Sequence, residues 1–547
     1  MNTEVVFIII VVFLVADFIV ERILEWVNMR AMAPVLPENL KGIYDEKEYA
    51  RFQNYKRETN RFDLISSTFS FIVMMVFLCT GGFGWWNAWV VTWTDQAVLQ
   101  TLLFMLGLSL VSGLLGLPFD WYATFHIEEK YGFNKTTMKT YGLDLLKGML
   151  VSGVIGGLLL SAVVWFYEWA GSFFWLYAWG IVSVFSVFMA MFYSQLIVPL
   201  FNKQTPLEAG ALRDKINAFA EKVGFKLDNI FVIDGSKRST KANAYFTGFG
   251  PRKRIVLYDT LIKDLTEEEI VAVLAHEVGH NKKRHTVQFM LASVIQTGVI
   301  LWLFSLFVNQ PALSMALGGD RACFQLGLIA FTILYSPLSM ILGLVMNAWS
   351  RKNEYQADAF AARYYDGESL ISGLKKISVK SLSNLTPHPL YEWVYYSHPS
   401  LLKRIRAIGQ IEAVDAVVLG GVVGIVVDAA AGDDGDVAVL AHVEGVVHDV
   451  LQARLRHDDG DVHRLALGAV RDADVDAGVV GLGGNVDVGR GMALDQFAVL
   501  AHVEGALRHA VHIGDLGEQV LVDGGKINSH DGLLLVQSGG FVQLPRA

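Results

Sequence analysis

The chain has 547 residues, of which 53% are hydrophobic, and its mean hydropathy is +0.39. Both values are high for a soluble protein and argue against an ordinary soluble enzyme. Acidic residues outnumber basic ones by 54 to 45, and we expect no nucleic-acid partner.

Seven apolar segments are each long enough to cross a bilayer, which takes about 20 residues. They lie near residues 4–27, 64–87, 97–118, 148–169, 172–198, 287–309 and 323–348. The first is not a cleavable signal peptide, because it has no basic region before it and no small-residue cleavage site. The sequence therefore predicts a polytopic α-helical membrane protein with seven transmembrane helices.

The basic residues between these segments predict their orientation. Lys and Arg are concentrated in the loops 28–63 and 119–147, whereas the connections near 88–96 and 169–172 contain neither. By the positive-inside rule the two basic loops are cytoplasmic, and the N-terminus lies outside. The soluble segment 199–286 and everything after the seventh span are then cytoplasmic too.

A polar stretch separates the fifth and sixth predicted spans. Within it, residues 208–223 have the pattern of an amphipathic helix, 231–233 form a short strand, and 243–258 read as a hairpin. In metalloproteases an edge strand beside the metal-binding helix holds an extended substrate by strand addition. The segment Asn243–Gly248 is the candidate, although an ordinary structural hairpin fits the sequence equally well.

Residues 272–280 read Ala-Val-Leu-Ala-His-Glu-Val-Gly-His. On a helix, His276 and His280 share one face one turn apart, the spacing at which two imidazoles bind one zinc ion. Glu277 lies beside His276, where it can act as general base on the attacking water without being a ligand. The alternative is a surface helix with two unrelated histidines, but the surrounding apolar residues favour a buried helix.

A zinc site of this kind needs a third protein ligand, normally a Glu on a later helix. The chain supplies Asn353-Glu-Tyr-Gln-Ala-Asp358, in which Glu354 and Asp358 are again four residues apart. We predict Glu354 as the third ligand and Asp358 as the group that accepts an N–H from a ligating His and fixes its ring. The alternative is a solvated helix face near Arg351 and Lys352.

Together these motifs resemble those of the type I CAAX prenyl protease family, integral-membrane zinc endopeptidases with seven spans. The resemblance covers roughly residues 1–410. The matching segments are 125–134, 243–248, 276–280, 353–358 and 397–399, followed by Arg404. It implies a ring of helices around a large water-filled intramembrane chamber, with an α+β gluzincin-like protease domain and a zinc site at the cytoplasmic end.

The resemblance also implies roles for three further residues. Asn243 would bind the substrate backbone, and His398 would donate to the oxyanion of the tetrahedral intermediate, which its chemistry allows. Arg404 would support the site by pairing with a carboxylate such as Asp358. Without the resemblance, the preferred interpretation of His398 is a helix-capping or loop residue before Pro399.

Near residue 413 the composition changes abruptly. Residues 414–547 contain no Trp or Tyr and only two Phe, and the octapeptide at 438–445 recurs at 498–505. Three interpretations compete: a fused repeat domain, a disordered low-complexity extension, or a translation artefact from a wrong reading frame. We favour the artefact, because the shift affects every residue class and falls where the family domain ends.

The predicted function is that of a zinc metalloendopeptidase whose partners are the bilayer and a peptide with an apolar or lipidated, CAAX-type anchor. In a bacterium the role would be membrane-protein quality control at the inner membrane. A seven-span receptor or transporter, or an inactive homologue, is the alternative, but a transporter leaves the two ligand motifs unexplained.

The sequence also predicts how the chain is divided into regions. They are spans 1–5 with their loops (1–198), the protease segment with the edge strand and zinc helix (199–286), spans 6 and 7 (287–348), the third-ligand helix and C-terminal catalytic segment (349–413) and the tail (414–547).

Overall fold

The structure is a computed structural model that describes residues 2–225, 230–247, 254–411, 534–537 and 540–543. The chain divides into two compact units, Met1–Glu412 and Ala413–Ala547. In the second unit, the described residues form one antiparallel hairpin of β5 (Leu534–Gln537) and β6 (Gly540–Gln543). The three interpretations of the tail otherwise concern residues outside the described ones.

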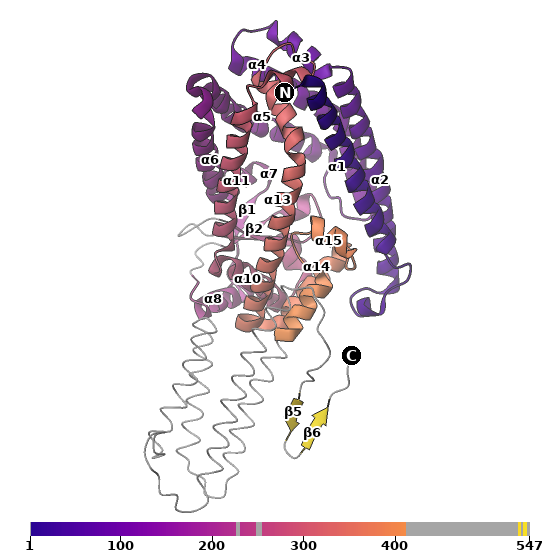
Figure 1. The fold of residues 1–547 in the computed structure, drawn as a ribbon. Coiled ribbons are helices and arrows are strands. Elements are labelled where there is room, and N and C mark those ends of the chain that lie inside the picture. Colours follow the sequence, from indigo (N-terminus) through magenta and orange to yellow (C-terminus); the bar gives the residue numbers. More distant parts are fainter. Residues whose placement is uncertain (1, 226–229, 248–253, 412–533, 538–539, 544–547) are drawn as a thin grey trace, which may run out of the picture. The chain divides into compact units, whose positions relative to one another are not determined.

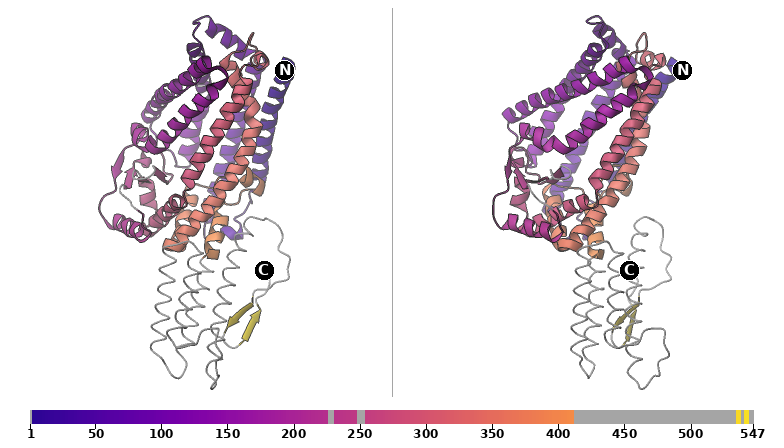
Figure 2. Two further views of the ribbon diagram at one scale, coloured as in Figure 1. Left: turned by 60° about the vertical axis from the view of Figure 1, so that its left-hand side comes forward. Right: turned by 90° about the vertical axis from the view of Figure 1, so that its left-hand side faces the viewer.

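The first unit is built around long apolar helices that run side by side (Figures 1 and 2). These are α1 (Thr3–Ala31), α2 (Glu46–Cys79), α4 (Ala97–Tyr122), α5 (Met138–Ala170), α6 (Phe174–Leu196), α11 (His285–Phe307) and α13 (Phe324–Ala361). Among the described residues, six continuous helical segments are long and apolar enough to cross a membrane. One of them, Met138–Phe201, contains both α5 and α6. The predicted polytopic helical fold is confirmed, and each predicted span overlaps one of these helices.

One predicted span has the wrong boundaries. The segment 64–87 was expected to be a single helix, but α2 ends at Cys79 and a new helix, α3 (Gly82–Val91), begins three residues later. Gly81 between them has a φ of 71°, in the left-handed region that glycine adopts without strain. Hydropathy misses this break because apolar residues continue through it.

A small sheet lies at one end of the helical bundle, with strand order β1-β2-β4-β3. Its strands are β1 (Gln204–Pro206), β2 (Ile230–Ile233), β3 (Ala244–Thr247) and β4 (Arg254–Tyr258). β2 and β4 are parallel, and the other pairs are antiparallel. The structure thus confirms the predicted strand and hairpin, and α8 (Ala211–Lys222) confirms the amphipathic helix. The hairpin turn, 248–253, lies outside the described residues.

Helix α10 (Glu267–Lys282) packs at this same end against α8, α13 and α14 (Gly367–Lys380) (Figure 1). It begins with a capping box, in which Thr266 and Glu269 satisfy each other's backbone N–H groups. Ile270, Val271 and Leu274 are at most 1% exposed, so the helix is buried on its sheet-facing and helix-facing sides. The edge strand β3 also contacts α10.

The remaining elements of the first unit are short. They are the 3-10 turns η1 (Glu38–Leu40), η3 (Gly171–Phe173) and η4 (Gly235–Lys237), the π-helices η2 (Ala123–Glu128) and η6 (Ala362–Asp366), and the helices α7 (Val198–Phe201), α9 (Asp259–Asp264), α12 (Pro311–Ala316) and α15 (Pro389–Tyr395). A last helical stretch, residues 401–411, follows α15. It carries Arg404 back toward the end of the bundle where α10 lies.

Candidate metal centre

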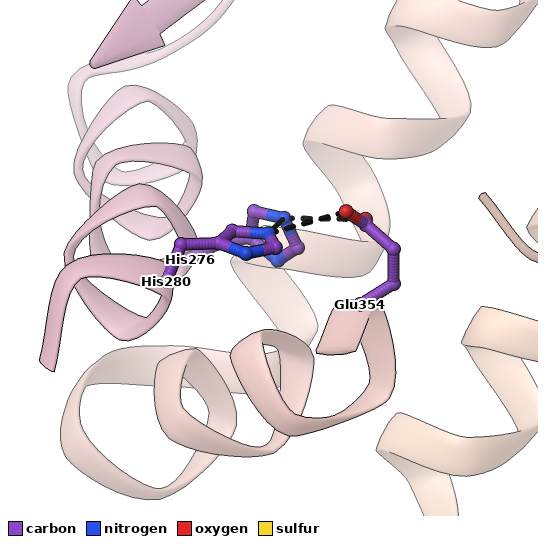
Figure 3. Close-up of side chains that lie close together, drawn as sticks. All are labelled: His276, His280 and Glu354. Atoms are coloured by element: carbon purple, nitrogen blue, oxygen red, sulfur yellow. Dashed lines mark hydrogen bonds and ion pairs between the residues drawn. The ribbon is translucent and has the colours of Figure 1, made fainter. Parts of the chain in front are cut away.

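Two helices supply the three side chains that the sequence singles out as metal ligands. His276 and His280 project from successive turns of α10, and Glu354 projects from α13 toward them (Figure 3). His276 and Glu354 are 7% and 3% exposed, respectively. The helices approach closely because α10 carries Gly279 at their contact, where an added Cβ would lie 3.2 Å from the Cα of Ala357.

The ligand atoms of these residues converge. The two imidazole Nε2 atoms are 3.1 Å apart. Glu354 places Oε1 3.2 Å from Nε2 of His280 and Oε2 3.4 Å from Nε2 of His276. Among the residues that the structure describes, this is the group of three or more His, Cys, Asp or Glu side chains with metal-binding geometry.

The donor set fits a zinc-type divalent ion. Zn–N bonds of about 2.0–2.1 Å at a tetrahedral angle separate two nitrogens by about 3.3 Å, close to the observed 3.1 Å. Within the described part of the chain, Oε2 of Glu354 is buried without a hydrogen-bond partner. A buried carboxylate oxygen is costly unless a cation compensates it, and a metal ion between the three side chains would do so.

A buried ion pair stands behind His276. Oδ1 of Asp358 accepts from Nδ1 of His276 at 2.8 Å. Arg404 donates to both oxygens of Asp358, through Nε at 2.8 Å and Nη2 at 2.6 Å. The N–H on Nδ1 leaves the Nε2 lone pair of His276 directed at Glu354 and His280, the tautomer that a metal ligand needs.

The electrostatics of the pocket favour a cation. Burial by itself lowers the pKa of His276, but the hydrogen bonds to Asp358 and Glu354 outweigh burial and raise it to about 9. Burial also lowers the pKa of Arg404, but the nearby carboxylates of Asp358, Glu354 and Glu277 raise it by more. The net pKa is raised, so the guanidinium stays charged. The surrounding carboxylates therefore stabilise positive charge at His276, which either a second proton or a metal ion can supply.

The other predicted site residues lie at different distances from this centre. Nε2 of His398 is 3.3 Å from Oε1 of Glu354, and its side chain is 62% exposed. Glu277 is half-buried on α10 and outside the ligand group. Asn243 is exposed at the start of β3, where its Oδ1 accepts from the N–H of Ala244. The structure therefore brings His398 to the ligand group and places Asn243 beside the edge strand.

Sequence reasoning missed His285, which contacts the ligand group, and Gln356, which contacts His285. Nδ1 of His285 lies 3.0 Å from Nδ1 of His280, and Nε2 of His285 lies 2.9 Å from Oε1 of Gln356. His285 is 2% exposed. A third histidine five residues after His280, and a Gln between Glu354 and the next acidic residue, were the available signals.

Two family profiles match most of the first unit. The profile of the CAAX prenyl protease N-terminal region, with five membrane helices, matches residues 26–203. The profile of peptidase family M48 matches residues 206–412, which contain α10, α13 and all three candidate ligands.

Individual relatives agree with the profiles. CAAX prenyl protease 1 homolog of Arabidopsis thaliana is 35% identical over 410 residues, which are 73% of this chain and 96% of the relative. CAAX prenyl protease 1 of Saccharomyces cerevisiae is 33% identical and shares 72% of this chain and 93% of its own length. The crystal structure of S. mikatae Ste24p matches with a TM-score of 0.71 and 34% identity, over 74% of this chain and 99% of that one.

Proposed function

The chain belongs to the CAAX prenyl protease group of peptidase family M48 and is a multi-pass membrane metalloprotease, and from this we propose that it uses zinc to cleave lipidated CAAX-type peptides. The observation that carries the zinc assignment is the convergence of two Nε2 atoms and a buried carboxylate oxygen that has no hydrogen-bond partner among the described residues. His276, His280 and Glu354 would hold the ion. When bound, zinc supplies a Lewis acid that polarises the scissile carbonyl and lowers the pKa of water.

Glu277 acts as the general base in this proposal. It takes a proton from the attacking water and returns it to the leaving amine nitrogen as the C–N bond breaks. A carboxylate in this role must not be tied up as a ligand, and Glu277 stands outside the ligand group. Its half-buried position on α10 leaves it accessible to water and substrate.

His398 acts as hydrogen-bond donor to the oxyanion that forms on the carbonyl oxygen. Its Nδ1 lies 2.9 Å from the hydroxyl of Ser397. If the hydroxyl donates to Nδ1, the proton sits on Nε2, the atom that faces the ligand group. The donor is then in place before the charge develops, which is the condition for oxyanion stabilisation.

The edge strand β3 holds the substrate backbone in this proposal. Among the strands that the structure describes, β3 pairs with β4 along one edge, and it also contacts α10. Its other edge would offer backbone groups to an extended peptide. Asn243, at the start of β3, lies where it can bind the same peptide. The water-filled chamber implied by the family resemblance would admit the lipid anchor.

The active site faces the cytoplasm in this proposal. The basic loops that predict the orientation contact one another and the protease segment: Tyr55 and Lys241 both bond Glu128, and Arg238 pairs with Asp144 at 2.7 Å. These contacts support placing all three segments on one side of the bilayer, and their Lys and Arg content favours the cytoplasmic side. Single cysteines labelled with an impermeant maleimide in intact cells test this: labelling at position 135 from outside would reverse the orientation.

The two relatives reported above are CAAX prenyl proteases by name and come from a plant and a fungus, which favours prenylated C-termini over bacterial quality control. A farnesylated peptide ending in a C-a-a-X sequence, offered to the purified zinc-loaded chain, tests the substrate class by mass spectrometry. We expect cleavage within that sequence, and much slower cleavage of the same peptide without the lipid. Equal rates for both peptides would refute the lipid requirement, and no cleavage of either would refute the substrate class.

A further inference from the structure

A third histidine stands directly behind one of the two histidine ligands. His285 is the first residue of α11, and its Nδ1 lies 3.0 Å from Nδ1 of His280. The other ring nitrogen of His280, Nε2, is the one that lies near Glu354. Nε2 of His285 lies 2.9 Å from Oε1 of Gln356, two residues after Glu354 on α13. At 2% exposure, this ring does not exchange these contacts for water.

Because Oε1 is the amide atom of Gln356 that faces His285, the protons of the three groups can be assigned. An amide oxygen only accepts, so Nε2 of His285 must donate to Gln356. A neutral imidazole has one N–H, which leaves Nδ1 of His285 as an acceptor. Nδ1 of His280 must then carry the proton in their contact, and Nε2 of His280 is left with a free lone pair. Nε2 is the atom that lies 3.2 Å from Glu354.

The backbone is bent to make this contact. Arg284, between α10 and α11, has a φ of 59° and ψ of 28°, a left-handed conformation that is unfavourable for a non-glycine residue. The turn sends the chain back so that His285 faces the preceding helix. A strained residue beside buried polar contacts is expected where the contact matters.

We infer that His285 and Gln356 are positioning residues that hold His280 in the tautomer and orientation required for zinc, as Asp358 does for His276. The inference rests on the proposed zinc site. The two ligands are then supported differently: His276 by a carboxylate and a guanidinium, and His280 by a neutral imidazole and an amide. Without the neutral pair, His280 could place its proton on Nε2 and lose its lone pair for the metal.

His285 is not itself placed to bind the ion. Its Nδ1 faces Nδ1 of His280, on the opposite side of that ring from Nε2. It is also absent from the ligand group, although His280 belongs to it. A count of imidazoles on the bound metal therefore separates the two roles: positioning predicts two, and direct ligation predicts three.

The test compares zinc affinities of the full-length chain in detergent, measured by competition with a chelator. His285→Leu and Gln356→Leu remove the two contacts. His285→Asn keeps an acceptor near the position of Nδ1, and Gln356→Glu keeps an acceptor for Nε2. Gln325→Leu is the matched control, since Gln325 is a buried Gln on the same helix whose amide bonds Asn87 and Thr101 far from the site. Thermal unfolding of the metal-free forms checks that each variant folds.

We expect both Leu variants to bind zinc about 10- to 100-fold more weakly, with an altered visible spectrum after cobalt substitution. His285→Asn, Gln356→Glu and Gln325→Leu should stay within about threefold of the parent. Parental affinity in folded Leu variants, or three imidazoles on the metal by X-ray absorption, overturns the inference. If His285→Leu does not fold, Gln356→Leu decides the question. A parent chain that binds no zinc would refute the zinc site first, and the positioning role with it.

Discussion

Two carboxylates stand close to the histidine pair, and their surroundings assign them different tasks. Glu354 is 3% exposed and contacts both rings. Glu277 is half-buried and belongs to the same helix turn as His276, but it is outside the ligand group. The first arrangement suits a ligand, and the second suits a base that must meet water and release a proton.

Glu277→Gln should abolish peptide cleavage and leave the metal bound, because an amide of the same shape cannot take a proton from water. We expect a loss of at least about 100-fold in kcat, measured on the zinc-loaded protein, with zinc content unchanged. His276→Ala is the contrast and should lose both metal and activity. Loss of zinc from Glu277→Gln would mean that Glu277 is a ligand and not the base.

Arg404→Leu should destabilise the fold as well as the site. It would leave Asp358, which is 0% exposed, as a buried charge with only His276 as partner, at a cost of about 3–5 kcal/mol. Arg238→Leu is the control, because its pair with Asp144 has 23% exposure on both sides and should matter less. Thermal unfolding in detergent measures both. Equal losses of stability in the two variants would show that burying the Asp358–Arg404 pair does not make it more important for stability than the more exposed pair.

At the scale of elements, the local patterns could be read from the sequence and the contacts between them could not. The spacing of His276 and His280 predicts a shared face because helical geometry is local. The contact of His285 with His280 depends on the left-handed backbone conformation of Arg284. No sequence pattern predicts that conformation for an arginine. The helix break at Gly81 was missed for a similar reason, because hydropathy carries no information about backbone conformation.

The approach of α10 to α13 also depends on a single residue. A Cβ on Gly279 would lie 3.0 Å from the Cβ of Phe360 and 3.2 Å from the backbone of Ala357. Gly279→Val should push the helices apart, separate Glu354 from the histidines and weaken zinc binding by about tenfold or more. Gly409→Val is the matched control, since a Cβ on Gly409 meets nothing within 4 Å. Unchanged zinc affinity in Gly279→Val would show that the helix contact is adaptable.

At the scale of the whole molecule, the family domain and the first compact unit both end at residue 412. The composition changes at the same place, because residues 414–547 have only two aromatic side chains. Truncation after residue 413 should therefore leave zinc content and peptide cleavage unchanged. If activity falls while expression and membrane insertion hold, the tail is a working part of the enzyme and not a passenger or an artefact.

The central claim is that His276, His280 and Glu354 form a zinc site on which proteolysis depends. Metal analysis of the purified full-length chain, before and after chelation and again after zinc is returned, tests it most directly. We predict about one zinc per chain, loss of peptide cleavage when the metal is removed, and recovery of cleavage when zinc is returned. The His276→Ala variant should bind no zinc and cleave no peptide. A folded chain that holds no zinc, does not rebind it and still cleaves peptide would contradict the account.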